Sequence, residues 1–257
     1  MTTAGNKTIA KNTMFLYFRM LVTMVISLYT SRVVLQVLGV DDYGIYQAVG
    51  GIVGFLSLIN GSLSTGTSRF MTYGLGEGNL KKLERIFTTT LTGHIIIALV
   101  IIIITETLGL WFLLNKMIIP SDRLNAALWV FHLSVLTAFF SLTQIPFNAC
   151  IIAHEKMSVY AYVSVAEAVL KLLIVYFLTI GNIDKLKLYA LLLCLLQICI
   201  ILFYRFYSVH HFQEARFRFS LDKKLLKEIT GFSGWSLFAS GSIALNNQGI
   251  LLLLSVR

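Results

Sequence analysis

Seven long apolar stretches run through the chain, separated by short polar segments. Each stretch holds about 20 residues or more, which is the length that an α-helix needs to cross the hydrocarbon core of a bilayer. A helix also satisfies its own backbone hydrogen bonds in lipid, so the pattern predicts an all-α polytopic membrane protein. The predicted spans are 13–38, 44–70, 88–114, 125–150, 158–180, 186–206 and 230–254.

Polar residues recur at helical spacing on the first, second, fourth, fifth and seventh of these spans. The third and sixth spans are almost uniformly apolar, and we expect them to face lipid. Serine and threonine often join membrane helices to each other, but five striped helices beside two bare ones favour a polar cavity within the bundle. The stripes comprise Arg19, Thr23, Ser27 and Thr30; Ser57, Asn60, Ser64 and Thr67; Ser134, Thr137, Ser141, Gln144 and Asn148; Tyr160, Ser164, Glu167 and Lys171; and Ser233, Ser236, Ser240 and Asn247.

Several charged residues lie within the predicted spans, where each needs a physical reason. A charge at the centre of a bilayer costs roughly 2.5–3.5 kcal/mol on insertion scales. Arg69 and Glu106 lie near span ends and are expected to extend toward the membrane surface. Arg32 is expected either to do the same or to pair with Asp41 or Asp42.

Three further charges lie on the polar stripes. Glu167 and Lys171 are four residues apart near the middle of the fifth span, so their side chains can pair directly. The pair is either a structural ion pair or a site whose titration couples transport to an ion. Arg19 has no acidic residue on its own span, and a guanidinium in a cavity is suited to bidentate contact with phosphate. We expect the cavity to be lined by Arg19, Asn60, Gln144, Asn148 and Lys171.

Basic residues are distributed unevenly between the two sides of this topology. With the N-terminus in the cytoplasm, the cytoplasmic segments carry twelve lysines and arginines against four on the opposite side. The positive-inside rule therefore predicts that orientation. The same asymmetry accounts for the net charge of +9, so no nucleic-acid partner is expected. The basic segment 220–229 is either an amphipathic helix lying on anionic membrane lipids or a solvated connector.

No arrangement of residues points to an enzyme or to a bound cofactor. The three cysteines match no zinc or redox spacing and are expected to be packing residues. His154 and Glu155 are adjacent, as are His210 and His211, but neither pair has further ligands at metal spacing. We therefore expect no metal site.

Four segments carry a family resemblance. The most specific is the arginine-bearing first span, residues 27–46, which runs into a Leu-Gly-x-x-x-Tyr-Gly turn; the others are 12–21, 146–156 and 232–236. These segments resemble the polysaccharide-biosynthesis flippases of the multidrug/oligosaccharidyl-lipid/polysaccharide (MOP) exporter superfamily. The resemblance covers essentially the whole chain. It implies a transporter of the bacterial inner membrane that moves undecaprenyl-diphosphate-linked glycans between leaflets by alternating access, for lipopolysaccharide and other surface polysaccharides.

The resemblance also implies an architecture of two six-helix lobes related by a pseudo-twofold axis along the membrane normal. Residues 1–204 would then form the first lobe, 205–229 a basic cytoplasmic connector, and 230–257 the first helix of the second lobe. Arg19 and Arg32 stand at positions that match the arginines expected to receive the pyrophosphate. Most of the second lobe is absent, so we expect either a fragment or a partner polypeptide that completes the transporter.

Two other functions stay open beside the flippase. One is a cation-coupled multidrug exporter of the same superfamily, whose cavity would favour acidic residues. The other is a membrane scaffold that recruits glycan-assembly enzymes without transporting anything.

Overall fold

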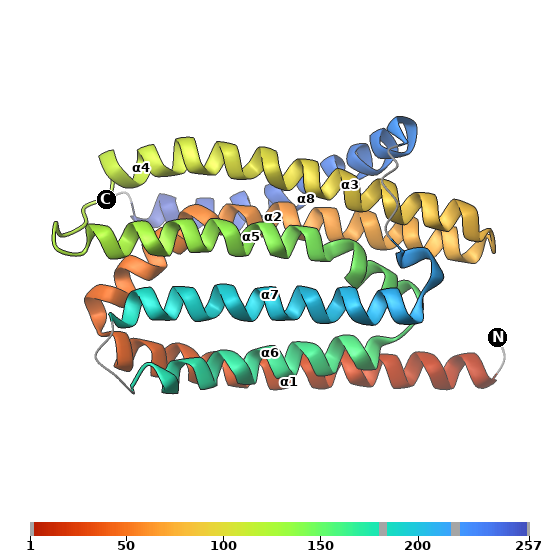
Figure 1. The fold of residues 1–257 in the computed structure, drawn as a ribbon, viewed down its shortest axis with the longest axis horizontal. Coiled ribbons are helices and arrows are strands. Elements are labelled where there is room, and N and C mark those ends of the chain that lie inside the picture. The colour runs from red at the N-terminus through yellow and green to blue at the C-terminus, as the bar shows by residue number, and fades with distance from the viewer. Residues whose placement is uncertain (1–2, 180–183, 217–221, 256–257) are drawn as a thin grey trace.

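The computed structural model describes residues 3–179, 184–216 and 222–255 (Figure 1). Helices account for almost all of these residues, and no strand occurs among them. The π-helical turn η1 (Thr105–Gly109) joins α3 to the short helix α4 (Leu110–Asn115), and the 3-10 turn η2 (Gln213–Ala215) follows α7. The long helices are α1 (Thr3–Leu38), α2 (Val40–Gly76), α3 (Leu80–Ile104), α5 (Leu124–Ala153), α6 (Met157–Phe177), α7 (Lys185–His211) and α8 (Lys223–Ser255).

The prediction of an all-α membrane protein is confirmed. Five described helical segments are long and apolar enough to cross a bilayer: Ala10–Leu38, Leu80–Asn115, Leu124–Ala153, Met157–Phe177 and Lys185–His211. The other two predicted spans fall on α2 and α8, which are 37 and 33 residues long. Side chains at 52, 54–58 and 240–255 lie outside the described part of those two helices.

The helices lie side by side along one common direction (Figure 1). Helix α5 packs directly against both α2 and α7, and these three helices form the middle of the bundle. On one side of them, α1 and α6 pack mainly against each other. On the other side, α3 packs on α5 and α2, and α8 packs on α2. The bundle is thus a central group of helices with a separate α1–α6 pair beside it.

The predicted connector is shorter in the structure than in the sequence, because α7 and α8 both extend into 205–229. Asp222 begins α8, where its Oδ1 accepts the backbone N–H of Leu225 at 3.2 Å. Its Oδ2 pairs with Arg85 of α3 at 2.6 Å. The hydrogen bond from Leu225, with Arg85 adding to it, lowers the pKa of the Asp222 carboxyl. The expected separate helix at 220–229 is therefore the first turns of α8, anchored to α3.

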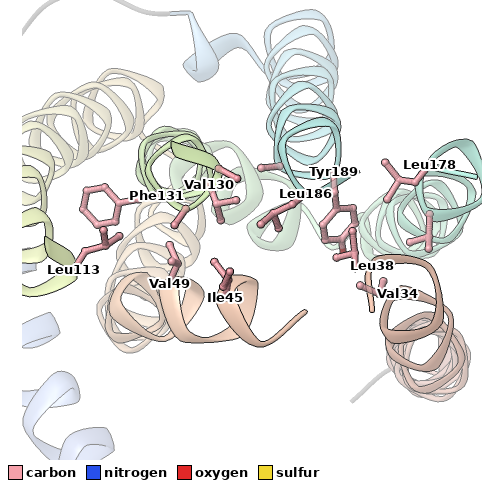
Figure 2. Close-up of a cluster of buried hydrophobic side chains, with 14 of the residues drawn as sticks. Val34, Leu38, Ile45, Val49, Leu113, Val130, Phe131, Leu178, Leu186 and Tyr189 are labelled. Carbon is pink, nitrogen blue, oxygen red and sulfur yellow. The ribbon is translucent and has the colours of Figure 1, made fainter. Parts of the chain in front are cut away.

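A cluster of apolar side chains fills one end of the bundle (Figure 2). It brings together Val34 of α1, Val49 of α2, Phe131 of α5 and Leu186 of α7, all less than 5% exposed. Lipid tails are as apolar as these side chains, so burial from water contributes little to helix association in a membrane. Close packing and the dispersion contacts that it brings hold the helices together here.

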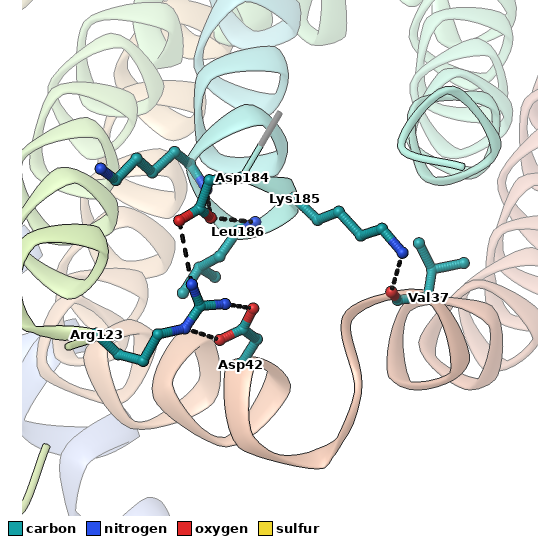
Figure 3. A network of polar contacts seen from close by, with 7 residues as sticks. Val37, Asp42, Arg123, Asp184, Lys185 and Leu186 are labelled. Carbon is teal, nitrogen blue, oxygen red and sulfur yellow. Dashed lines mark hydrogen bonds and ion pairs between the residues drawn. The ribbon is translucent and has the colours of Figure 1, made fainter. Parts of the chain in front are cut away.

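A polar network lies at the same end, which we call the Arg123 end (Figure 3). Arg123 Nε donates to Asp42 Oδ1 at 2.8 Å, its Nη2 also bonds Asp42, and its Nη1 donates to Asp184 Oδ2 at 3.2 Å. Asp184 in turn caps α7, since its Oδ1 accepts the backbone N–H of Leu186 at 3.1 Å. The hydrogen bond to Asp42 raises the pKa of Arg123. One guanidinium thus joins the starts of α2, α5 and α7.

This network excludes one of the two alternatives for Arg32, the ion pair with Asp42, because the partner of Asp42 is Arg123. The other alternative, that Arg32 extends to the membrane surface, stays a prediction. Arg32 is exposed on α1 and makes no ion pair with any residue of the described ranges. The sequence did not reveal that Asp42 pairs with Arg123, because the two residues are 81 positions apart in the chain.

We expect Arg123→Ala to destabilise the protein. The substitution leaves the carboxylate of Asp42, 7% exposed, without its partner. Losing hydrogen bonds to a charged group costs roughly 1.5–3 kcal/mol of stability. In a chain of this size, each kcal/mol lowers the melting temperature by about 2–4 °C. The measurement is the melting temperature in detergent. Lys116→Ala, which removes only a contact of the ammonium with the Trp111 ring at 5.7 Å, is the control. Equal losses in both variants would contradict the role given to Arg123.

Candidate functional site

A polar cleft of about 380 Å³ opens between α2, α5, α6 and α7. It lies midway along the bundle, and all four helices contribute polar groups to it. Those lining residues are Tyr46, Asn60, Ser134, Thr137, Ser141, Glu167, Lys171 and Gln197. Three of the four helices, α2, α5 and α6, carry stripes that the sequence assigned to a cavity.

A second cleft of about 200 Å³ lies beside it, between α1, α2, α6 and α7. Its polar lining comprises Ser27, Thr30, Ser31, Tyr43, Tyr46, Gln47, Lys171 and Tyr189. The two clefts share Tyr46 and Lys171. The two clefts therefore lie next to each other at these two side chains, along the boundary between the α1–α6 pair and the central helices.

The shared lysine belongs to an ion pair. Lys171 Nζ donates to Glu167 Oε1 at 2.6 Å, one helical turn away on α6, so the predicted pairing is present. The side chains are 46% and 27% exposed in the isolated chain. Among the described residues that line the larger cleft, these two are the charged ones, and their charges balance.

Amide side chains continue the polar path from the cleft into the bundle. Asn60 Nδ2 of α2 donates to Ser141 Oγ of α5 at 2.7 Å. Gln197 Nε2 of α7 donates to Gln144 Oε1 of α5 at 2.9 Å. Gln144 Nε2 lies 3.5 Å from Asn148 Oδ1, the limit of a hydrogen bond. Of these predicted residues Asn60 lines the cleft, while Gln144 and Asn148 are not among its lining residues; Gln144 contacts the cleft residue Gln197.

The two arginines predicted to face an anion lie elsewhere. The guanidinium carbon of Arg19 is 4.7 Å from the centre of the Tyr160 ring of α6, a cation–π contact. Its Nε is buried and makes no hydrogen bond within the described part of the chain. Neither Arg19 nor Arg32 is among the residues that line the two clefts. Their expected role in binding an anion stays a prediction.

The expectation that the sixth span faces only lipid is wrong. Helix α7 places Tyr189 in one cleft and Gln197 in the other. It also buries Tyr204, 2% exposed, on the same side. The span looked featureless because its few polar groups are large and widely spaced. Gln197 was the one signal in the sequence that pointed to this face.

The third span is only partly open to its surroundings. In the isoleucine-rich part of α3, side chains such as Ile103, 64% exposed, point outward, while Ala98 is fully buried. That this outward face meets lipid stays a prediction. The first half is buried and polar, and His94 sits there 2% exposed. Its Nδ1 is 2.7 Å from the Thr90 carbonyl oxygen, and its Nε2 is 3.4 Å from Thr67 Oγ1 of α2. This histidine holds α3 to α2 and does not reach the clefts.

Helix α8 was expected to border the cavity, and its described residues do not line either cleft. Ser233 packs on Gly66 of α2 so closely that a Cβ at Gly66 would lie 2.2 Å from Ser233 Oγ. This part of the serine stripe therefore serves helix packing. Ser240 and Asn247 lie outside the residues whose side chains are described, as does Ser57 of α2.

The two charges expected to reach the membrane surface instead contact neighbouring helices. Glu106 lies in the π-helical turn and pairs with His132 of α5, Oε2 to Nδ1 at 2.9 Å. Arg69 of α2 lies over the Phe232 ring of α8 at 4.4 Å. No local pattern reveals these partners, since each sits on a helix far away in sequence.

One group of described residues has the chemistry to hold a metal ion. Cys150, His154 and Glu214 bring their ligand atoms within 4.8 Å of one another, at the end of the bundle opposite Arg123. No metal site was expected here from the sequence, because the adjacent His154 and Glu155 have no further ligands at metal spacing. Glu214 is 60 positions away, and only the fold brings it close.

Helices long and apolar enough to cross a membrane thus border a polar cleft. Residues 16–177 match the MatE family, and the chain belongs to that family. No curated protein matches the sequence. This family assignment is coarser than the resemblance to polysaccharide flippases described above.

Solved transporters of this superfamily share the fold. A multidrug resistance MATE family transporter in an outward-facing conformation aligns with a TM-score of 0.77 at 15% identity, over 93% of this chain and 53% of its own. A MATE protein in its straight conformation gives 0.77 at 16% identity, over 93% and 54%. A MOP superfamily transporter from Pyrococcus furiosus gives 0.73 at 13% identity, over 91% and 53%. The chain spans about half the length of these transporters.

We expect water to enter the cleft from at least one side of the membrane. In a protein whose exposed Cys199 is replaced by serine, a cysteine at Ser134 in the cleft should react with a charged, membrane-impermeant thiol reagent. A cysteine at Ile103, exposed but facing lipid, should react at least about ten-fold more slowly, because the reagent attacks the hydrated thiolate. Equal rates at both positions would mean that the cleft is dry or that Ile103 is not in lipid.

Proposed function

We propose that this chain forms the first lobe, with the first helix of the second lobe, of a cation-coupled exporter that works by alternating access. The observation that carries the proposal is the Glu167–Lys171 ion pair at the junction of the two clefts. A carboxylate within a membrane is costly unless it has a function or a partner. Here it has a partner that a cation can replace, in a cleft that the substrate can enter.

The pair supplies a mechanism for coupling. With Glu167 ionised, its charge is balanced by Lys171 at 2.6 Å, and α6 is held in one arrangement. Binding of a proton or a sodium ion at Glu167 weakens that contact and leaves the Lys171 ammonium facing the clefts. The ion and a cationic substrate then compete for the same carboxylate. By thermodynamic linkage, each lowers the affinity for the other, which is the requirement for exchange.

The likeness to solved transporters supports a role in export. The substrate has to be inferred from the residues of the cleft. One solved relative is described as a multidrug resistance transporter. The transporter from Pyrococcus furiosus is described as having a binding pocket of reverse polarity that suggests a different function. Because one fold hosts different functions, the substrate has to be argued from the residues of the site. The cleft here offers one carboxylate and no surplus of positive charge among its described residues.

Flipping of an undecaprenyl-diphosphate-linked glycan is the second candidate, and one observation favours it. An apolar groove of about 430 Å³ runs between α1 and α6, lined by Phe15, Phe18, Ala161, Tyr162, Val165, Ala166, Val169 and Leu170. Arg19 stands one helical turn from Phe15 on the same face of α1. A groove for a lipid tail beside a guanidinium for a diphosphate suits such an amphiphile. The exporter ranks first because Arg19 and Arg32 lie outside the clefts.

Location and partners follow from the same proposal. We propose a bacterial inner-membrane protein with the N-terminus in the cytoplasm, on the strength of the twelve-to-four asymmetry in basic residues. The N-terminus and the basic start of α8 would then face the anionic inner leaflet. Because the chain spans about half of the solved transporters, a second lobe from the same gene or from a partner polypeptide would complete the pathway.

We expect Glu167→Gln to uncouple transport. The amide keeps the shape of the side chain but cannot bind a proton or a sodium ion as the carboxylate does. With the protein as its native host expresses it, gradient-driven efflux of a fluorescent organic cation from proteoliposomes should slow by roughly 5–150-fold, the usual range of coupling free energies. Glu228→Gln, the same change at an exposed position on α8, should leave efflux unchanged. Wild-type gradient dependence in Glu167→Gln would refute the coupling role.

Arg19→Gln separates the two candidates. If the protein flips a diphosphate-linked glycan, this variant should lose surface polysaccharide in the native host while its abundance in the membrane stays normal. Arg205→Gln, at an exposed arginine of α7, is the matched control. If polysaccharide is unaffected in Arg19→Gln and cation efflux persists, the flippase proposal fails and the exporter remains.

A further inference from the structure

Three metal-binding side chains converge at the end of the bundle opposite Arg123, far from the clefts. Cys150 comes from the last turns of α5, His154 follows that helix directly, and Glu214 belongs to the turn η2 after α7. Cys150 Sγ is 3.5 Å from Glu214 Oε1, and His154 Nε2 is hydrogen-bonded to the same oxygen. Two segments 60 residues apart therefore share one cluster of a thiol, an imidazole and a carboxylate.

The carboxylate of Glu214 is buried, so a nearby positive charge would stabilise it. Glu214 is 2% exposed and Cys150 is fully buried. A carboxylate removed from water is strongly destabilising unless a cation or several hydrogen bonds compensate it. Within the described part of the chain, the only ion pair that Glu214 makes is with His154. A metal ion held between these side chains would supply positive charge beside the buried carboxylate.

We propose that Cys150, His154 and Glu214 form a binding site for a zinc ion. Thiolate, imidazole and carboxylate together are a ligand set that zinc prefers, and three protein ligands with a water in the fourth position complete a tetrahedron. The side chain of His154 is 26% exposed, which leaves one side of the cluster open to that water and to the entering ion.

Part of the geometry already matches that of a bound ion. Zinc–ligand bonds of about 2.0–2.3 Å place neighbouring ligand atoms roughly 3.3–3.6 Å apart. The sulfur–oxygen separation of 3.5 Å has this value. The histidine nitrogen and the carboxylate oxygen must move apart, because the ion takes the place of the hydrogen bond between them, and the three ligand atoms, which lie within 4.8 Å of one another, must close around the ion. The Cys150 thiol proton passes to bulk water as the zinc–sulfur bond forms, so the site holds a thiolate and a carboxylate against the two charges of the ion.

Packing around the cluster favours a fixed imidazole. The His154 ring stacks on Phe212 with 4.2 Å between ring centres and 14° between planes. Phe212 is itself 5% exposed, and Ala215 beyond it is fully buried. A histidine held this way loses little freedom when it binds an ion, which raises the affinity of a site.

The position of the site gives it a consequence for the fold. Zinc would tie η2, which leads from α7 toward α8, to the end of α5. In the proposed two-lobe transporter this turn begins the connection between the lobes. The metal would therefore fix the point from which the second lobe departs. The binding site itself does not depend on the transport proposal.

The direct test is metal binding by the purified protein, expressed without a polyhistidine tag and stripped with a chelator. Competition with a fluorescent zinc chelator should give one ion per chain with a Kd below about 1 µM. Cobalt added in place of zinc should produce a thiolate-to-metal charge-transfer band, which reports a cysteine ligand without any substitution. Zinc should also slow hydrogen exchange of the Gln213–Ala215 amides by at least about ten-fold, because it closes their local opening.

Substitutions assign the ligands. Cys150→Ser and Glu214→Gln should each weaken zinc binding by more than roughly 100-fold, beyond the usual effect of changes outside the ligand shell. Cys194→Ser, another buried cysteine, and His211→Gln, an exposed nearby histidine, should bind as the unmodified protein does. The proposal is overturned if the unmodified protein binds no stoichiometric zinc, if cobalt gives no charge-transfer band, or if His211→Gln abolishes binding while Cys150→Ser retains it.

Discussion

The hydrogen-bonded contact of Arg123 with Asp42 and Asp184 is the interaction on which the arrangement of the bundle depends. Within lipid, apolar side chains gain almost nothing by leaving the tails for a neighbouring helix, so association needs close packing and polar contacts. One guanidinium fixes the starts of α2, α5 and α7 to each other, and the apolar cluster beneath it packs against the same helices. The polar cleft lies farther along these helices.

Two apolar clusters frame that cleft. One lies below the Arg123 network, and the other lies near the Glu214 end around Phe87 and Phe147, whose rings meet edge to face at 5.4 Å. Between them, amides, hydroxyls and the Glu167–Lys171 pair replace apolar side chains. The α1–α6 pair borders this polar zone and packs mainly on itself, so it is the part of the lobe that can shift at the lowest loss of contact.

The sequence predicted chemistry well where both partners lie on one helix. Glu167 and Lys171 are four residues apart, so helical geometry alone brings them together. It failed where the partner is on another helix: Arg123 with Asp42, Glu106 with His132, and Glu214 with His154 are each joined by packing that no local pattern encodes. Arg19 is the reverse case, since its place on a polar stripe was evident but the Tyr160 ring that receives it was not.

The sequence by itself determined that the chain lies in a lipid bilayer and that it is helical. The apolar runs are long enough to cross the bilayer, and within lipid a helix satisfies the hydrogen bonds of its own backbone. It also determined which faces of α2, α5 and α6 are polar, since residue spacing sets the face. Only the tertiary structure decided which of those faces meet. It added α7 to the cleft through Gln197 and moved Arg19 out of it. The reason is that the rotation of each helix, and the helix it packs against, depend on contacts between residues far apart in the chain. Such contacts leave no repeating pattern in the sequence.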